Sequence, residues 1–163
     1  MDWSDWAIRK TFPGVQQVPC SQLVAALADA TQRIILLDVR EPAEFAMSHI
    51  VGAQNIAPAA HSDVEKLIQA LPSLRERAEG GDDGRVVKVV CYCSIGYRSS
   101  QLAYAIGEHL PHLAGRVYNL EGSIFRWANS GHAVVDAVGK PANKVHRYSA
   151  LWGQLLNAEL RGS

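Results

Sequence analysis

The sequence predicts an α/β fold in which helices flank an open parallel β-sheet. Its 163 residues suit one domain, which at this size buries roughly 70% of the surface of the unfolded chain. Short apolar runs rich in β-branched residues recur along the chain, and a pattern of helical period follows each of them. A repeated strand-helix order is typical of sheets whose parallel strands are connected by helices.

Three apolar runs are the strand candidates. The segments IILLDV (34–39) and VVKVVCY (86–92) are continuous rather than alternating, as expected for strands that helices cover on both faces. We therefore predict that they are central parallel strands. RVYNL (116–120) predicts a further strand.

Two helices are expected in the first third of the chain. SQLVAALADA (21–30) is amphipathic, and Ser21 is a suitable N-cap because its hydroxyl can accept from a free N–H group of the first turn. EPAEFAMSH (41–49) is the second candidate. Pro42 suits its first turn, where no backbone N–H is needed.

The helix between the two central strands has the clearest pattern. Its apolar residues recur at helical spacing, namely Val64, Leu67, Ile68 and Leu71. Ser62 and Glu65 are spaced as a capping box, and Pro72 would end the helix.

Helical patterns also follow the second and third strands. The helix that begins near Ser99 has one apolar side, formed by Leu102, Ala103, Ile106 and Leu110. SIFRWANS (123–130) predicts another helix, with Gly131 as its stop. Near the end of the chain, Leu151, Trp152 and Leu155 share a helical face, which predicts a helix that docks on the domain.

The composition limits the classes of partner that we expect. The 16 basic and 16 acidic side chains balance, and no run of Lys and Arg favours nucleic acid or an anionic membrane. No apolar stretch has the length of a signal peptide or a membrane span. We therefore expect a cytoplasmic protein, with no nucleic acid or membrane partner, whose partners are smaller. Its three cysteines are too few for a disulfide framework, so at least one thiol is free.

The segment CSIGYRSS (93–100) has the features of a reactive thiol site. Cys93 directly follows a central strand, and ligands of open parallel sheets bind at this edge. The free N–H groups of the next helix and the charge of Arg98 would favour a thiolate, which is the nucleophile in sulfur chemistry. Gly96 would let the loop curl so that its amides face inward as an anion nest.

The other candidate residues are interpreted as structural. Cys91 lies within a strand and Cys20 precedes a helix, so packing is the preferred interpretation for both. The charged set Asp38, Arg40, Glu41 and Glu44 is read as an ion network that fixes a turn, and His49 as a hydrogen-bonding residue. Since the histidines show no spacing typical of metal ligands, we predict no metal site.

The tryptophans are also interpreted as packing residues. Trp127 is assigned to the core. Trp3, Trp6 and Trp152 are expected to pin the terminal segments to the domain.

Three segments, LLDVREPAEFAMSHIVGAQNI, YCSIGYRS and LEGSIFRWANSGHAVV, occur in this order and resemble the signature segments of the single-domain rhodanese sulfurtransferases. The resemblance covers residues 15 to about 135. It implies a five-stranded parallel sheet flanked by helices, with the active loop between a central strand and the following helix. It also implies that Cys93 carries the transferred sulfur, cradled by the loop residues Ser94, Ile95, Gly96, Tyr97, Arg98 and Ser99.

The family chemistry implied by this resemblance needs no cofactor. Cys93 would take sulfane sulfur from thiosulfate or a persulfide donor, and cyanide, a small thiol or an acceptor protein would remove it. A sulfur carrier or binding module with little turnover is the alternative. Cdc25-type phosphatases and arsenate reductases share the fold, but their loop has one residue more between Cys and Arg, and this argues against phosphoryl transfer here.

Several positions depart from the family pattern. Ser123 replaces the second glycine of a Gly-Gly pair, and we expect no direct effect of this change on Cys93. Arg98 is the only charged residue of the active loop, which suggests a less charged or protein-bound donor. Residues 1–14 and 137–163 lie outside the expected rhodanese-like domain (15–136) and are expected to form extensions, the second with a docking helix.

Overall fold

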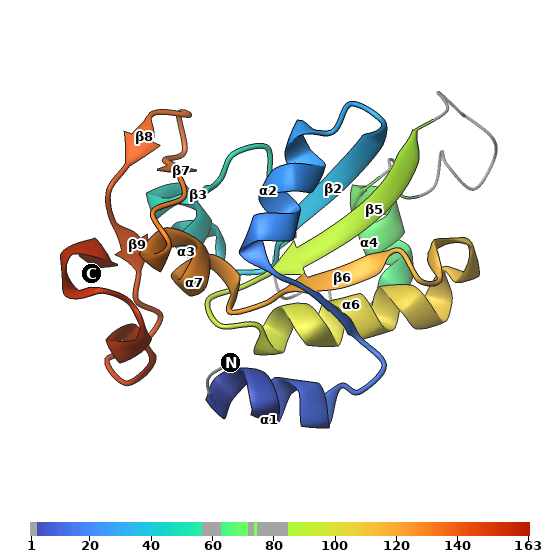
Figure 1. Cartoon of the computed structure of the whole chain (residues 1–163), viewed down its shortest axis with the longest axis horizontal. Helices are drawn as coiled ribbons and strands as arrows, with labels where there is room; N and C mark the ends of the chain where they lie inside the picture. Colours follow the sequence, from blue (N-terminus) through green and yellow to red (C-terminus); the bar gives the residue numbers. More distant parts are fainter. Residues whose placement is uncertain (1–2, 57–62, 72–73, 75–84) are drawn as a thin grey trace.

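A five-stranded parallel sheet lies at the centre of the structure, a computed structural model that describes residues 3–56, 63–71, 74 and 85–163. Its strand order is β1-β6-β5-β2-β4, and β6, β5 and β2 are labelled side by side in Figure 1. The strands are β1 (Gln16–Val18), β6 (Val117–Leu120), β5 (Val86–Tyr92), β2 (Gln32–Asp38) and β4 (Gln54–Asn55). All neighbouring pairs are parallel, so the predicted fold class is confirmed.

The register of the central strands brings their carboxyl ends together. Asp38 at the end of β2 pairs with Tyr92 at the end of β5, and Cys91 pairs with Asn119 of β6. Strand β5 has the predicted bounds, whereas β2 begins earlier than predicted and ends at Asp38. Residues that follow these strands therefore share one edge of the sheet.

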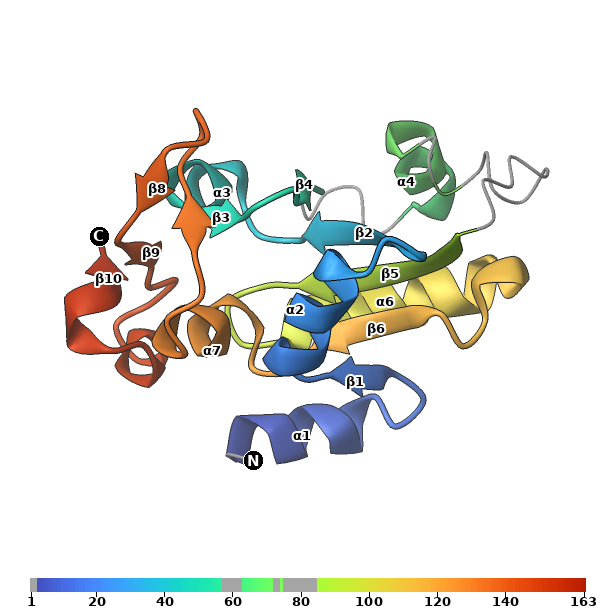
Figure 2. The same ribbon diagram turned by 45° about the horizontal axis from the view of Figure 1, so that its top comes forward.

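Helices cover both faces of the sheet (Figure 2). The side chains of α4 (Val64–Ala70) and α6 (Tyr97–His109) pack with Val89 and Cys91 of β5. On the opposite face, α2 (Cys20–Ala28) and α7 (Ser123–Asn129) pack with Val90 and Tyr92. This alternation explains why the strand from Val89 to Tyr92 is apolar at every position, since both faces are buried there.

Helix starts differ from the predicted caps. Helix α2 begins at Cys20, so Ser21 is not its cap. Helix α4 is capped by Asp63, whose side chain accepts from the Lys66 N–H at 3.2 Å; Ser62 lies outside the described residues. Helix α6 begins at Tyr97 after Gly96, so the two serines that follow lie within its first turn. Helix α3 (Pro42–Met47) begins at its proline, as predicted.

Short elements surround the helix-covered sheet. An antiparallel sheet contains β3 (His49–Ile50), β7 (Val134–Val135) and β8 (Pro141–Ala142), and a parallel pair contains β9 (Val145–His146) and β10 (Arg161–Gly162). The 3-10 turns are η2 (Pro111–Leu113), η3 (Trp152–Leu155) and η4 (Ala158–Leu160). In the described part of the chain, no helix is long and apolar enough to cross a membrane.

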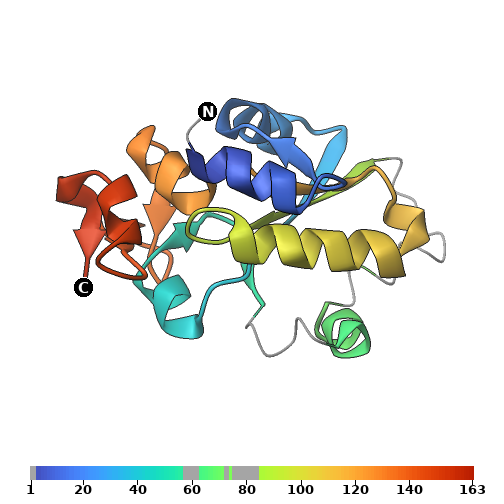
Figure 3. The same ribbon diagram turned by 90° about the horizontal axis from the view of Figure 1, so that it is seen from below.

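The N-terminal helix α1 (Trp3–Thr11) lies alongside the first part of α6 (Figure 3). Its anchors are buried Ile8 and an ion pair between Asp5 and Arg126 at 2.6 Å. Trp3 and Trp6 are 67% and 57% exposed, so the expectation that burial of these rings pins the segment is wrong. Trp127 is buried in the core, as predicted.

The C-terminal segment docks without the predicted helix. Leu151 and Leu155 are exposed, and the buried residue is Leu156, which joins the core beside α7. The side chain of Asn129 in α7 donates to the Leu155 carbonyl at 2.7 Å and accepts from the Asn157 N–H at 2.8 Å. Short 3-10 turns form because these backbone groups bond to a side chain instead of to a regular helix ladder.

A fully buried ion pair connects β2 to the following turn. Arg40 Nη2 donates to Asp38 Oδ2 at 2.6 Å, and Nε donates to Oδ1 at 2.9 Å. Arg40 Nη2 also donates to the Ser48 carbonyl at 2.7 Å. Both side chains are 0% exposed, so the structural interpretation of these two residues is confirmed.

We predict that Asp38→Ala lowers the free energy of unfolding by about 3–5 kcal/mol, because it leaves the Arg40 charge buried without its partner. Lys66→Gln breaks an exposed pair with Asp63 and should cost less than about 1 kcal/mol. Urea unfolding of both variants checks this difference. Equal midpoints for the two variants would contradict it.

Candidate functional site

Cys93 lies in a tight loop between β5 and α6, and its side chain is 1% exposed. The Gly96 N–H donates to Cys93 Sγ at 3.1 Å. Gly96 has φ +117°, and a Cβ at this position would lie 3.1 Å from both Asn119 Nδ2 and Ile8 Cδ1. The loop therefore needs glycine here, both for its conformation and for the close packing around it.

The surroundings of Cys93 favour its thiolate. Burial alone would raise the pKa of the thiol, but the charge of Arg98, the hydroxyl and amide of Ser99 and the amide of Gly96 together hold the pKa below its usual value. These groups combine an ionic and a hydrogen-bonding stabilisation of the charged form. The loop can therefore hold a nucleophilic sulfur away from water.

The first residues of α7 hold the loop from below. Ile124 N–H donates to the Cys93 carbonyl at 3.1 Å, and Phe125 N–H donates to the Ser94 carbonyl at 3.2 Å. The Cys93 N–H donates to Ser123 Oγ, also at 3.1 Å. The expectation that Ser123 has no direct effect on Cys93 is therefore wrong.

The backbone conformation of Ser123 explains why a glycine suits this position. Its φ is +50°, in the left-handed region where a residue with a Cβ is uncommon. The serine accepts this backbone conformation and adds a hydroxyl that satisfies a buried N–H group. Serine at this position lacks the conformational freedom of glycine but gains a hydrogen bond to the loop of Cys93.

Arg98 is paired with Glu44 rather than left free. The two guanidinium nitrogens lie 3.1 and 3.2 Å from the carboxylate oxygens, and Ser94 Oγ donates to Glu44 at 3.3 Å. Glu44 thus stands at the candidate site, apart from the Asp38–Arg40 pair. This corrects the expectation that all four charged residues of that segment form one structural network.

The carboxylate of Glu44 is firmly ionised. Its burial opposes the charge, yet the bonds from Arg98 and from the Glu41 N–H (2.9 Å) hold its pKa below the usual value. The positive charge beside Cys93 is therefore largely balanced by a neighbouring negative charge. The ring of Tyr148 covers the same guanidinium, 4.6 Å from its Cζ.

The remaining loop residues have different positions. Ser99 interacts with Cys93 and donates to Asn119 Oδ1 at 2.6 Å. Ile95 packs against the core on the α7 side. Tyr97 is half exposed and contacts the ring of Phe12. Of the six predicted loop residues, Gly96 and Ser99 direct backbone amides at the sulfur of Cys93, and Arg98 and Ser99 act on it through their side chains.

The other two cysteines differ from Cys93 in the direction in which their pKa is shifted. Both are buried free thiols, and burial raises the pKa of Cys91 and Cys20 above the usual value. Such thiols stay protonated and are poor nucleophiles. Within the described residues, no group of three or more His, Cys, Asp or Glu side chains is arranged to hold a metal ion.

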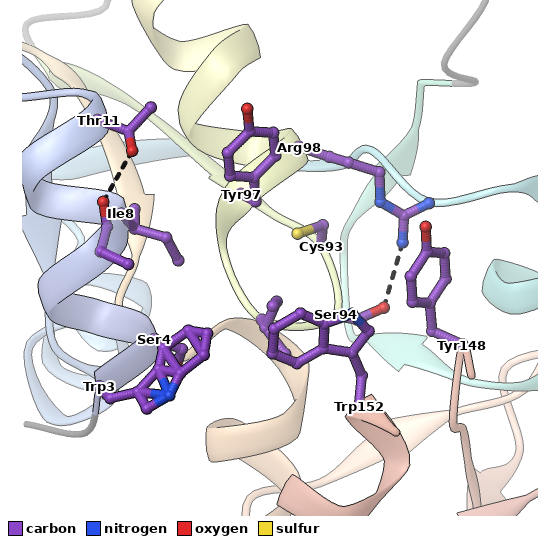
Figure 4. Close-up of a pocket in the computed structure, with 12 residues that line it drawn as sticks. Trp3, Ser4, Ile8, Thr11, Cys93, Ser94, Tyr97, Arg98, Tyr148 and Trp152 are labelled. Carbon is purple, nitrogen blue, oxygen red and sulfur yellow. Dashed lines mark hydrogen bonds between the residues drawn. The ribbon is translucent and has the colours of Figure 1, made fainter. Parts of the chain in front are cut away.

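A pocket of about 340 Å³ opens above the loop. Cys93, Ser94 and Arg98 form its floor and one side, and the opposite sides come from both ends of the chain (Figure 4). Trp3 and Ile8 belong to α1, whereas Tyr148 and Trp152 belong to the C-terminal segment. Sequence reasoning missed this contribution because the four residues are far from Cys93 in the chain and carry no motif.

Comparison with known proteins identifies the family of this chain. The sequence matches the rhodanese-like domain over residues 21–130. A relative from Allochromatium vinosum, described as a sulfurtransferase, is 32% identical over 130 residues, which cover 77% of this chain and 99% of the relative.

Solved structures support the same fold. A thiosulfate sulfurtransferase from Pseudomonas aeruginosa aligns with 94% of this chain and 26% of its own, with a TM-score of 0.60 and 15% identity. A Saccharomyces cerevisiae protein, described as a homolog of single-domain rhodanese and of the Cdc25 phosphatase catalytic domain, aligns over 72% of this chain and 82% of its own, with a TM-score of 0.59 and 20% identity. From the extent of the family match and the identity to the sulfurtransferase, we conclude that the chain belongs to the family of rhodanese-like domains.

Proposed function

We propose that the protein is a sulfurtransferase that carries sulfane sulfur on Cys93. The observation that carries the proposal is a nearly inaccessible cysteine whose sulfur accepts the Gly96 N–H and whose pKa is held below its usual value. Its other support is the family relationship. In this proposal residues 15–136 form the rhodanese-like domain of a cytoplasmic protein, residues 1–14 and 137–163 are its extensions, and no metal or organic cofactor takes part.

The reaction has two steps. The Cys93 thiolate attacks the outer sulfur of thiosulfate or of a persulfide. The bond between the two donor sulfurs breaks, and its electron pair leaves with sulfite or with the donor thiolate. A cyanide ion, a small thiol or an acceptor protein then attacks the outer sulfur of the Cys93 persulfide and restores the thiolate.

The loop residues have defined roles in this scheme. The amides of Gly96 and Ser99 stabilise the negative charge on sulfur before and after transfer. Arg98 adds a positive charge, and Glu44 holds the guanidinium in place through two bonds. Ser94 joins this pair, and the side chains of Ile95 and Tyr97 close the sides of the loop.

Loop length distinguishes sulfur transfer from phosphoryl transfer. Four residues separate Cys93 from Arg98, a turn that closes around a single sulfur atom more readily than around a tetrahedral phosphate. The description of the yeast neighbour as a rhodanese-family tyrosine phosphatase makes p-nitrophenyl phosphate a necessary negative control. A sulfur carrier with little turnover is the remaining alternative, because it needs the same nucleophile.

We expect thiosulfate or an organic persulfide to add the mass of one sulfur, about 32 Da, to the wild type and Cys91→Ser but not to Cys93→Ser. The physical reason is that Cys91 keeps its proton in the core. Intact-protein mass spectrometry, followed by cyanide and a thiocyanate assay, measures loading and turnover. Equal loss of loading in both variants would mean that Cys93 is not the only nucleophile or not the nucleophile at all. Loading without turnover would indicate a carrier.

The rate of sulfur loading should depend on the ionisation of Cys93. Its lowered pKa gives Cys93 a larger thiolate fraction at neutral pH than an ordinary cysteine has, so the rate should fall as the pH drops through that lowered value. Ser99→Ala removes a hydroxyl that helps to lower the pKa of Cys93, so we expect the acid limb to move up by about one pH unit.

Ser100→Ala is the matched control for this pH profile. The Ser100 hydroxyl is buried one residue away and has no hydrogen-bond partner among the residues that the structure describes, so its removal should leave the acid limb in place. Loading rates of the three proteins across a pH series provide the comparison. An unchanged limb in Ser99→Ala would show that the Ser99 hydroxyl does not stabilise the reacting thiolate.

Glu44→Gln should improve the reaction with thiosulfate. The substitution removes the negative charge that balances Arg98 and leaves an amide oxygen to accept the Glu41 N–H. We expect KM for thiosulfate to fall about threefold or more at low salt, with a smaller change at high salt. Glu41→Gln alters an exposed carboxylate directly before the same helix and should leave KM unchanged. A rise in KM for Glu44→Gln would mean that Glu44 acts mainly by positioning Arg98.

A further inference from the structure

The pocket above Cys93 is built largely from segments that the family match does not include. That match spans residues 21–130, whereas α1 and residues 148–152 supply Trp3, Ile8, Tyr148 and Trp152 to the pocket wall. The rings of Trp3 and Trp152 meet edge to face, with centroids 5.9 Å apart. The two ends of the chain therefore complete one enclosure around the reactive sulfur (Figure 4).

The size of this enclosure exceeds what an inorganic donor needs. Its volume is about 340 Å³, whereas an apolar cavity of about 150 Å³ is enough to bind benzene. Small-molecule sites combine apolar walls with a few placed polar groups. Here the charged group lies beside Cys93, and the upper wall is mostly aromatic and aliphatic, with Ser4 and Thr11 as its hydroxyl residues.

The charge of the pocket also disfavours a compact dianion. Among the residues that line the pocket, all within the described part of the chain, Arg98 is the only cationic side chain. Its guanidinium is engaged by both oxygens of Glu44 and covered by Tyr148. A donor with two negative charges would lose its hydration here and meet a cation that is already balanced.

The position of Tyr148 is specific rather than incidental. Its φ of +61° lies in the left-handed region, and its N–H donates to His146 Nδ1 at 3.0 Å. A residue in such a conformation persists only where its surroundings fix it, and such residues gather at ligand sites. This conformation directs the ring over Arg98, at the rim of the pocket.

We propose that this pocket recognises an apolar alkyl or aryl group on the sulfur donor, and that Ile8, Tyr148 and Trp152 determine this specificity. The inference rests on the proposed function of Cys93. For an organic persulfide R–S–SH, the Cys93 thiolate bonds to the outer sulfur, the S–S bond between the inner and outer donor sulfurs breaks, and R–S⁻ leaves with the electron pair and takes up a proton from water. The group R stays in the apolar enclosure while the sulfur reaches the loop.

Two thiosulfonates test the proposal because they differ only in their organic group. Benzenethiosulfonate and methanethiosulfonate each carry one negative charge and release a sulfinate when the outer sulfur is transferred. We expect kcat/KM of the wild type to be at least about tenfold higher for the benzene compound, the scale of discrimination that apolar pockets provide. Sulfur loading by mass spectrometry and cyanide-dependent turnover both report it.

The ratio of the two kcat/KM values is the decisive quantity, because it does not depend on the fraction of folded protein. Ile8→Ala and Trp152→Ala should each lower this ratio by about fivefold or more, since they remove apolar wall. Trp6→Ala is the matched control, because Trp6 lies on α1 but not in the pocket wall, and it should keep the wild-type ratio.

The outcomes separate this inference from the proposed function. A wild-type ratio near one, or a ratio that Ile8→Ala and Trp152→Ala leave unchanged, would overturn the assigned specificity while sulfur transfer itself stands. Absence of sulfur loading from thiosulfate, both thiosulfonates and an organic persulfide would overturn the role of Cys93, and this inference with it.

Discussion

The Gly96 N–H donates to Cys93 Sγ, with 3.1 Å between nitrogen and sulfur. This hydrogen bond requires a tight loop, and the tight loop in turn fixes most of the residues around it. Gly96 must adopt a positive φ, the first residues of α7 must hold the carbonyls of Cys93 and Ser94, and Ile8 of α1 must fit against the turn. A buried anion is costly unless donors already face it. Strand β5, helix α6 and helix α7 meet at the one edge of the sheet where such donors converge.

Two ion pairs separated by a few residues serve different purposes. Asp38 and Arg40 are fully buried, and their side chains bond to each other and to neighbouring backbone, so they fix the turn after β2. Glu44 lies on the next helix but reaches the active loop, where it orients Arg98 and balances its charge. A guanidinium held in this way can stabilise a single sulfur anion without attracting every dianion in solution.

The sequence predicted what depends on local pattern and missed what depends on distant contacts. Apolar periodicity located β5, α6 and α7, and the residue types around Cys93 indicated the anion nest. The roles of Glu44 and Ser123 could not be read in this way, because they face the loop from elements 49 and 30 residues away in the chain. Position 123 alone gave a signal. The family pattern has glycine there, and glycine is typical of positions with a positive φ. The helix predicted at the C-terminus failed because Asn129 of α7 engages the backbone of that segment.

The pocket wall and the sulfur-binding loop belong to different parts of the chain, and this separation has an evolutionary consequence. The loop is constrained by the geometry of the sheet edge and tolerates little variation. The wall comes from α1 and the C-terminal turns, which are anchored at a distance by Asp5–Arg126 and by Asn129. Under the proposed function, mutations in the terminal segments would change which compounds reach the sulfur while the sheet and its loop are inherited unchanged, so that new selectivity would arise without loss of the chemistry.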